Sequence, residues 1–144
     1  MRLALAEAAE AASEGEVPVG AVILSPSGEV IARGHNRREA DHDPTAHAEI
    51  VAIRQAAQAS GSWRLDRCAL VVTLEPCTMC AGALSIARIR RLYYGATDPK
   101  GGAVDSGIRF FDSPTCHHRP DVYGGIGGQE AAALLREFFV GRRG

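Results

Sequence analysis

The sequence predicts an α/β fold in which a sheet is layered with helices. Segments of strand-like composition alternate with segments whose apolar residues recur at helical spacing. Glycine or proline stands at most of the boundaries between these segments. Residues 68–74 are almost continuously apolar, as expected for a strand covered by helices on both faces. The 144 residues suffice for a buried core, and we expect residues 1–144 to form one domain.

The first third of the chain predicts a helix followed by a hairpin. Residues 4–12 are alanine-rich with apolar residues at helical spacing, and Gly15 ends this helix. Residues 17–24 read as a buried strand. A Ser-Pro-Ser-Gly turn over residues 25–28 leads into a second strand at residues 30–32. The polar residues 34–43 predict a loop.

The middle of the chain predicts two helices that each begin near a proline. Pro44 precedes a helix over about residues 46–59, with Asp43 or Thr45 as the N-cap and Gly61 as its end. After the strand at residues 68–74, Pro76 begins a short helix that reaches about residue 87. Residues 91–95 form the next strand.

The last third predicts a long loop and a closing helix. Residues 96–128 are rich in glycine and proline and are predicted to be mostly loop. Within them, residues 122–123 are a possible short strand. Residues 129–140 form an amphipathic helix that Gly141 ends. The whole chain then has about five strands.

Composition and charge exclude several classes of protein. Hydrophobic residues make up 46% of the chain and charged residues 23%, and the formal net charge is −1. No apolar run approaches the ~20 residues of a membrane helix. Glutamates in the first 16 residues do not resemble a secretion signal, so we expect a cytoplasmic protein without a membrane partner.

Two groups of arginines interrupt this otherwise balanced charge. Such groups are usually solvated surface, and they contact phosphates only where they lie beside a reactive cleft. The groups are Arg88, Arg90 and Arg91, and Arg136, Arg142 and Arg143.

The pattern that carries chemistry is His47-Ala48-Glu49 followed by Pro76-Cys77-Thr78-Met79-Cys80. The pattern supplies one imidazole and two thiolates as metal ligands. Glu49 adds a carboxylate that is not needed as a ligand. A structural zinc site has four protein ligands, whereas a catalytic site keeps one position for water. Three ligands with an adjacent acid therefore indicate zinc-activated water chemistry.

The chemistry of these side chains is consistent with that interpretation. Cys77 and Cys80 lie three residues apart at the start of a helix, where positive potential favours thiolates. Thiolate and imidazole ligands suit zinc better than magnesium or calcium. Zinc lowers the pKa of a bound water from 15.7 toward about 7. Glu49 would point away from His47 on a regular helix, but it can reach the open side of a metal that lies over the helix end, as general acid and base.

Other interpretations remain open for the isolated motifs. A C-x-x-C pair alone is often half of a structural zinc site or a redox pair, and an H-x-E pair alone means little. A closed site requires a fourth ligand, and the remaining histidines and cysteines lack a matching motif. We expect Cys68 and Cys116 to be free thiols.

With these motifs the chain resembles the zinc-dependent cytidine-deaminase superfamily, and within it the bacterial tRNA-specific adenosine deaminases. The most specific blocks are residues 16–21, 43–49 and 73–83. The resemblance implies a three-layer α/β/α fold with a central mixed sheet of about five strands. It also implies hydrolytic deamination of adenosine to inosine at the wobble position, position 34, of a tRNA anticodon.

The resemblance also implies roles for individual residues. His47, Cys77 and Cys80 would hold one Zn²⁺ per subunit. Activated water would attack C6 of the base while Glu49 shuttles protons and ammonia leaves. Asn36 would hydrogen-bond the target nucleoside, and Ala48 would offer it backbone groups. For Asn36 the alternative is an ordinary turn residue.

Contacts with the rest of the RNA are implied for two further segments. Asp98 and Lys100 match a loop that touches nucleotides beside the target, although a plain Asp-Pro turn is the alternative. The C-terminal helix resembles an RNA-contacting helix through Phe138, Phe139, Arg142 and Arg143. The family pattern further implies a homodimer and, as substrate, an arginine tRNA. Residues 101–128 cannot be matched residue by residue to that pattern, so substrate contacts there stay undecided.

Two other functions compete with RNA editing. The same zinc chemistry serves deaminases of free bases or nucleotides such as guanine, cytosine or dCMP. A zinc-stabilised RNA-binding module without catalysis is the alternative outside enzymes. Glu49 distinguishes that module from an enzyme, since only catalysis requires its carboxylate.

Overall fold

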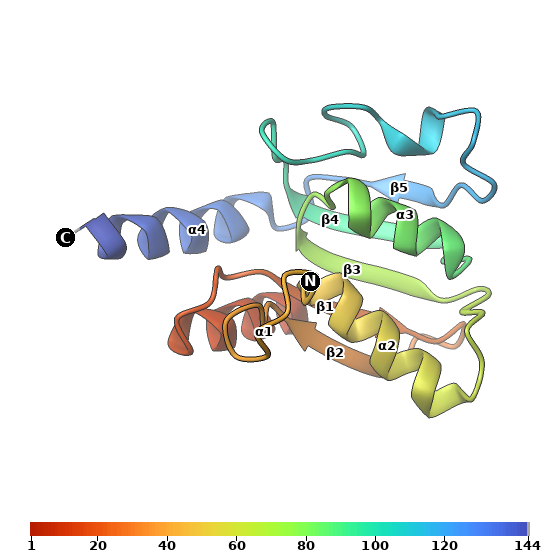
Figure 1. The fold of residues 1–144 in the computed structure, drawn as a ribbon, viewed down its shortest axis with the longest axis horizontal. Coiled ribbons are helices and arrows are strands. Elements are labelled where there is room, and N and C mark those ends of the chain that lie inside the picture. The colour runs from red at the N-terminus through yellow and green to blue at the C-terminus, as the bar shows by residue number, and fades with distance from the viewer. Residues whose placement is uncertain (144) are drawn as a thin grey trace.

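The computed structural model describes residues 1–143, and its centre is a mixed sheet of five strands in that part of the chain (Figure 1). The order across the sheet is β2-β1-β3-β4-β5. β1 pairs antiparallel with both β2 and β3, whereas β3, β4 and β5 run parallel. The strands are β1 (Gly20–Leu24), β2 (Val30–His35), β3 (Ala69–Leu74), β4 (Arg91–Ala96) and β5 (Asp121–Tyr123).

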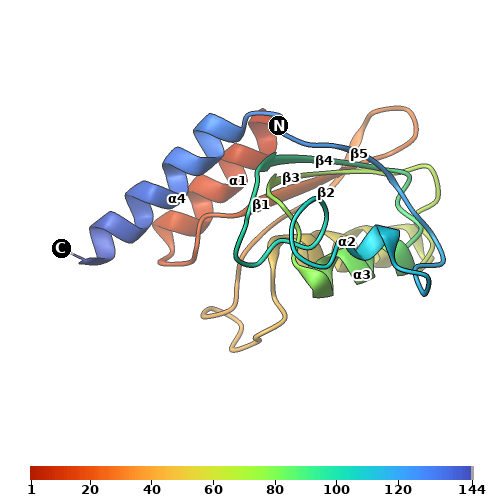
Figure 2. The ribbon, with the colours of Figure 1, turned by 90° about the horizontal axis from the view of Figure 1, so that it is seen from above.

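Helices cover both faces of this sheet (Figure 2). α1 (Arg2–Ser13) and α4 (Gly128–Arg143) lie on one face, and α2 (Ala48–Ser60) and α3 (Thr78–Ile86) lie on the other. Alternate residues of β1 enter the two cores: Val22 packs with Ala4 of α1, whereas Ile23 packs in the core that includes α2 and α3. The predicted α/β fold with three layers is therefore confirmed.

Two glycines allow the helices to lie close to the sheet. A Cβ on Gly20 would stand 2.1 Å from the Ala4 carbonyl oxygen of α1. A Cβ on Gly34 would stand 2.7 Å from the Ala48 carbonyl oxygen of α2, on the opposite face. The prediction that a loop begins at residue 34 was therefore wrong: Gly34 belongs to β2, where the absence of a side chain admits the helix.

The start of β1 and the cap of α2 also differ from prediction. β1 begins at Gly20 rather than at residue 17, because Pro18 has no N–H to donate and the Val19 N–H donates to the Val17 carbonyl. Neither Asp43 nor Thr45 caps α2. The N-cap position is His47, while one Asp43 carboxylate oxygen accepts bonds from the Thr45 N–H and hydroxyl.

Helix ends follow backbone conformation rather than residue type alone. Gly61 ends α2 with a φ of 70°, as predicted. Gly141 does not end α4, which continues to Arg143, because that glycine has no positive φ. Pro76 was predicted to begin α3, but the helix begins two residues later, at Thr78, with Cys77 in the N-cap position.

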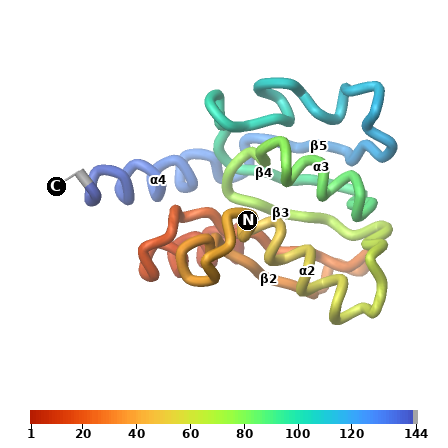
Figure 3. The backbone as a smooth tube through the Cα atoms, viewed as in Figure 1, coloured from red at the N-terminus to blue at the C-terminus, as the bar shows by residue number. Residues whose placement is uncertain are grey.

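The segment between β4 and β5 runs along the β5 edge of the sheet (cyan in Figure 3). As predicted it is mostly loop, and its one helical piece in the described residues is a single 3₁₀ turn, η1 (Phe110–Asp112). None of the helices within residues 1–143 is long and apolar enough to cross a bilayer.

Candidate metal centre and active-site pocket

Two helix N-termini meet at the carboxyl end of β3. His47 is the N-cap residue of α2 and Cys77 is the N-cap residue of α3. Both have extended backbone, with ψ of 154° and 178°. Helix N-termini carry unpaired N–H groups and positive potential, which favours thiolate and carboxylate groups beside them.

The three predicted metal ligands come together at this point. His47 Nδ1 lies 3.6 Å from both Cys77 Sγ and Cys80 Sγ. A tetrahedral zinc ion with Zn–S of ~2.3 Å and Zn–N of ~2.05 Å requires sulfur and nitrogen atoms about 3.6 Å apart. The donor set and these two distances therefore fit one zinc ion. Among the described residues, the group contains no fourth His, Cys, Asp or Glu ligand.

The pKa values of the Cys77 and Cys80 thiols move in opposite directions. A hydrogen bond from Cys80, helped by one from His47, lowers the pKa of Cys77 to about 4. The Cys80 thiol pKa is raised, because Cys80 donates to Cys77 and is buried. The pKa of His47 is raised by its bond to Cys77. These shifts favour a thiolate at Cys77 and a protonated thiol at Cys80, and metal binding would release the remaining ligand protons.

Glu49 lies in the first turn of α2 and is only 4% exposed. It lines a pocket of about 250 Å³ together with His47 and Cys77. The spacing argument that turned Glu49 away from His47 does not apply, because His47 is extended rather than helical. Burial raises the pKa of Glu49 to about 7, and the Cys77 charge adds to this effect, although the Glu49 backbone N–H and His47 oppose it.

Asn36 lies at the same pocket and is 7% exposed. Its Nδ2 donates to the Val17 carbonyl at 3.0 Å, and its Oδ1 accepts the Ala48 N–H at 2.9 Å. Asn36 therefore satisfies an N–H at the start of α2, which we had expected from Asp43 or Thr45. Ala48 is fully buried, and its N–H is engaged by this bond.

Asp98 and Lys100, the two predicted loop residues, line different hollows. Asp98 lines the metal pocket, and its Oδ1 accepts the N–H groups of Lys100 and Gly101 at 3.2 and 3.0 Å. The Asp-Pro turn and the placement at the pocket thus occur together. Lys100 instead lines a hollow against α4, beside Phe139 and Val140.

The end of α4 forms a second, smaller hollow beside the metal pocket, and Asn36 lines both. Phe138 is half-buried and Phe139 is 47% exposed. The Arg142 guanidinium lies 4.7 Å from the Phe138 ring centroid and donates to the Gly15 carbonyl at 2.7 Å. The side chain of Arg143 lies outside the described residues.

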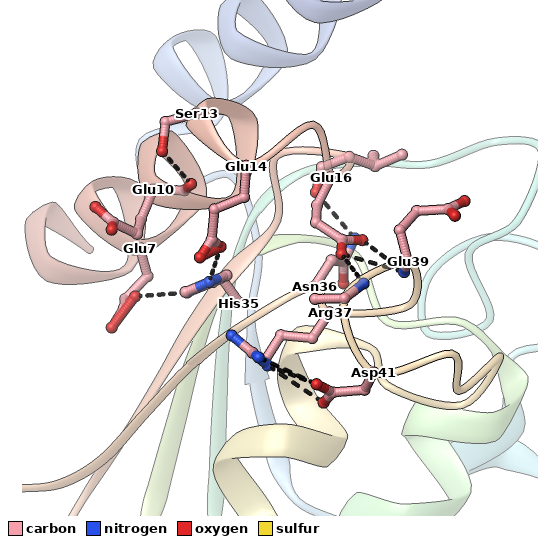
Figure 4. Close-up of polar contacts among 12 residues, drawn as sticks. Glu7, Glu10, Ser13, Glu14, Glu16, His35, Asn36, Arg37, Glu39 and Asp41 are labelled. Atoms are coloured by element: carbon pink, nitrogen blue, oxygen red, sulfur yellow. Dashed lines mark hydrogen bonds and ion pairs between the residues drawn. The ribbon is translucent and has the colours of Figure 1, made fainter.

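Sequence reasoning missed the buried carboxylates around the pocket. Glu75, 2% exposed, accepts hydrogen bonds from the loop that follows β4. Glu16 accepts the N–H groups of Glu39 and Ala40 (Figure 4). Glutamate is usually a surface residue, so composition offers no signal for such positions. The one hint is the place of Glu75 directly before Pro76 and Cys77.

A histidine joins the first helix to the second strand. His35 Nδ1 lies 2.9 Å from Glu7 and its Nε2 lies 2.8 Å from Glu14 (Figure 4). Burial opposes a charge on His35, but the two carboxylates outweigh it and raise its pKa. Because both ring nitrogens of His35 contact carboxylates, His35 is excluded as a metal ligand.

Comparison with known proteins places this site in a family. The cytidine and deoxycytidylate deaminase zinc-binding region matches residues 1–96. A tRNA-specific adenosine deaminase of Agrobacterium fabrum is 60% identical over 143 residues, which are 99% of this chain and 93% of the relative.

Solved structures show the same fold. One, from a study of A-to-I editing by tRNA:A34 deaminases, has a TM-score of 0.92 and 61% identity over 94% of this chain and 97% of its own. A guanine deaminase of Nitrosomonas europaea has a TM-score of 0.78 and 27% identity over 96% of this chain and 80% of its own. The chain belongs to the cytidine and deoxycytidylate deaminase zinc-binding family.

Proposed function

We propose that this protein deaminates adenosine to inosine at the wobble position, position 34, of a tRNA anticodon. The observation that carries the proposal is the site itself: the cluster of His47, Cys77 and Cys80 lies at a pocket that Glu49 lines together with His47 and Cys77. The choice of substrate is supported by the Agrobacterium fabrum relative, which is similar over nearly the whole of both chains.

The reaction converts adenosine and water to inosine and ammonia. His47, Cys77 and Cys80 would hold a zinc ion, which would supply the Lewis-acid chemistry that makes water a nucleophile near neutral pH. Glu49 takes a proton from that water and delivers it to the base as the C6–O bond forms. Glu49 then takes the proton of the new C6 hydroxyl and passes it to the amine, the C6–N bond breaks, and ammonia leaves. A pKa of about 7 suits Glu49 to both proton transfers.

The remaining site residues orient the base. The Asn36 amide has a second N–H and a second oxygen lone pair beyond the two bonds it makes in the protein. We assign these groups to the nucleoside, together with backbone groups at Ala48. A pocket of about 250 Å³ suits a single base turned out of its stack, so an unpaired anticodon loop is the expected target.

Contacts with neighbouring nucleotides are assigned to the two segments beside the pocket. Asp98 is on the pocket wall, and Lys100 faces the hollow next to α4. Phe139 offers an exposed ring on which a base can stack, and Arg142 and Arg143 supply positive charge.

Three further assignments belong to the proposal. The substrate is an arginine tRNA, on the family pattern. The protein is a homodimer, for which the exposed apolar side chains of Met79 and Ile86 on α3 are a suitable surface. The protein works in the cytoplasm, where Cys68 and Cys116 remain free thiols.

The test is an assay of the zinc-loaded protein with a transcribed anticodon stem-loop, with guanine and cytidine in parallel. We expect inosine at position 34 of the stem-loop and no ammonia from either small molecule. Ammonia released only from guanine would instead favour the activity named for the Nitrosomonas europaea neighbour, with which this chain shares its fold. Binding of the stem-loop without any inosine would favour the non-catalytic module.

A further inference from the structure

We propose that Glu75 is a positioning residue whose buried carboxylate shapes residues 98–106 into one wall of the active-site pocket. The carboxylate acts on substrate affinity through this wall and takes no part in the chemical step. The inference deepens the proposed function and rests on it for the identity of the substrate.

The carboxylate of Glu75 accepts five hydrogen bonds from this one segment. Oε1 accepts the Asp98 N–H at 3.0 Å and the Ser106 hydroxyl at 2.9 Å. Oε2 accepts three successive backbone N–H groups, those of Val104, Asp105 and Ser106, at 3.0, 2.9 and 2.9 Å. Successive N–H groups that converge on one oxygen form an anion-binding concavity, which here is filled by a side chain of the same protein.

Within residues 1–142, no cationic side chain pairs with this carboxylate. Among residues 1–142, none of the ion pairs includes Glu75. Its 2% exposure leaves almost no contact with water. The backbone of residues 98–106 therefore supplies nearly all of the solvation of this carboxylate, and the carboxylate in turn holds that backbone.

Gly102 confirms the closeness of the contact from the other side. A Cβ on Gly102 would lie 2.5 Å from Glu75 Cδ, 2.6 Å from the Asp98 carbonyl oxygen and 2.7 Å from Glu75 Oε1. Gly102 does not have a positive φ, so space rather than backbone conformation requires glycine here. Any side chain at residue 102 would push the segment off the carboxylate.

The held segment faces the reactive site. Asp98 and Gly101 line the pocket that contains His47 and Glu49. The Ala103 N–H donates to the Pro76 carbonyl at 2.9 Å, directly before the metal ligand Cys77. The wall and the ligands thus share a scaffold, but Glu75 is not among the ligand atoms.

The kinetic experiment compares Glu75→Gln, Glu75→Asp, Gly102→Ala and the native protein on the anticodon stem-loop. A glutamine keeps at most one oxygen and turns an NH₂ toward the backbone N–H groups, so it loses two or three of the five bonds. We expect KM to rise about tenfold or more, with kcat within about twofold and one zinc per chain retained. Glu75→Asp keeps the charge and should fall between native and Glu75→Gln.

A control and a double variant separate positioning from general destabilisation. Ile89→Val shortens a fully buried side chain outside the pocket and should leave KM unchanged. The double variant Glu75→Gln, Gly102→Ala should raise KM little more than either change alone, because both break one contact. A fall in kcat with unchanged KM, or additive effects in the double variant, would overturn the inference.

Amide hydrogen exchange tests the same contact without any substrate. The N–H groups of Val104, Asp105 and Ser106 should exchange slowly in the native protein and at least about tenfold faster in Glu75→Gln. Unchanged exchange would overturn the inference even if editing is observed. If the native protein edits no stem-loop, the proposed function fails, while this measurement still decides whether Glu75 orders the segment.

Discussion

Glu49 and Glu75 line the same pocket and are 4% and 2% exposed, and their pKa values move in opposite directions. Burial raises the pKa of Glu49 to about 7. Burial acts on Glu75 as well, but backbone N–H groups, first that of Asp98 and then that of Ser106, outweigh it and lower its pKa. Burial decides the pKa shift of Glu49, whereas the hydrogen-bond donors around Glu75 outweigh its burial.

The local backbone explains the difference between the two. Glu49 lies within the first turn of α2, where its own backbone N–H and the Cys80 thiol bond its carboxyl without outweighing burial. Glu75 follows β3 directly, and the chain returns past it after β4 with three N–H groups in succession. One carboxyl is therefore suited to exchanging a proton, and the other to remaining charged.

The largest expected effect separates the two glutamates by chemistry. Glu49→Gln should lower kcat for editing by about 10⁴-fold, because the proton carrier is lost, with zinc content unchanged. Glu75→Gln should keep kcat. Single-turnover assays at saturating stem-loop, with metal analysis of each variant, measure this contrast. Equal losses of kcat in both variants would remove the distinction.

Metal removal should affect the two regions differently. Dialysis against a chelator should abolish editing and lower the unfolding free energy by about 4 kcal/mol relative to protein in zinc at ~1,000 times its Kd. Added zinc should restore both. The exchange rates of the Val104 and Ser106 amides should barely change, since Glu75 holds them independently of the metal. Loss of their protection with the metal would tie the segment to the zinc site.

The stability of the zinc-free protein should rank the two glutamates in the reverse order. Glu75→Gln should lower the unfolding free energy by about 1–3 kcal/mol, because buried N–H groups lose their acceptor. Glu49→Gln should change it by less than about 0.5 kcal/mol or raise it, since a neutral amide avoids the desolvation of a carboxylate. Urea unfolding of both variants decides the order. A larger loss in Glu49→Gln would contradict the comparison.

The smallest expected effect concerns the carboxylates of Glu7 and Glu14, whose partner is the cationic form of His35. The pKa of His35 is raised from 6.5 by Glu7 and Glu14, so its contribution to stability is complete below about pH 6.5 and is lost as the pH rises through its folded value. The difference in unfolding free energy between native protein and His35→Gln should stay below about 1 kcal/mol, because Glu14 is partly exposed. Urea unfolding between pH 5 and 9, a range of about four units around the pKa of histidine, measures it. A difference that grows with pH would contradict the assignment.

Local features of the sequence predicted the fold class and the composition of the metal cluster. The H-x-E pair and the C-x-x-C pair begin 30 residues apart, each at the start of a helix, and the three ligand atoms come together as expected. The layered α/β fold followed from alternating strands and helices. The roles of Glu49, Asn36 and the RNA-contacting residues, and the single domain over residues 1–144, stay predictions.

The sequence by itself therefore determined which ligands are present and which layers surround them, because spacing along one helix or strand carries that information. Only the tertiary structure decided how non-local backbone groups are satisfied. Asn36 caps α2 across twelve residues, and Glu75 binds a loop up to 31 residues away. The physical reason is that a backbone N–H donates to any acceptor that folding brings near, so its partner leaves no periodic trace in the sequence.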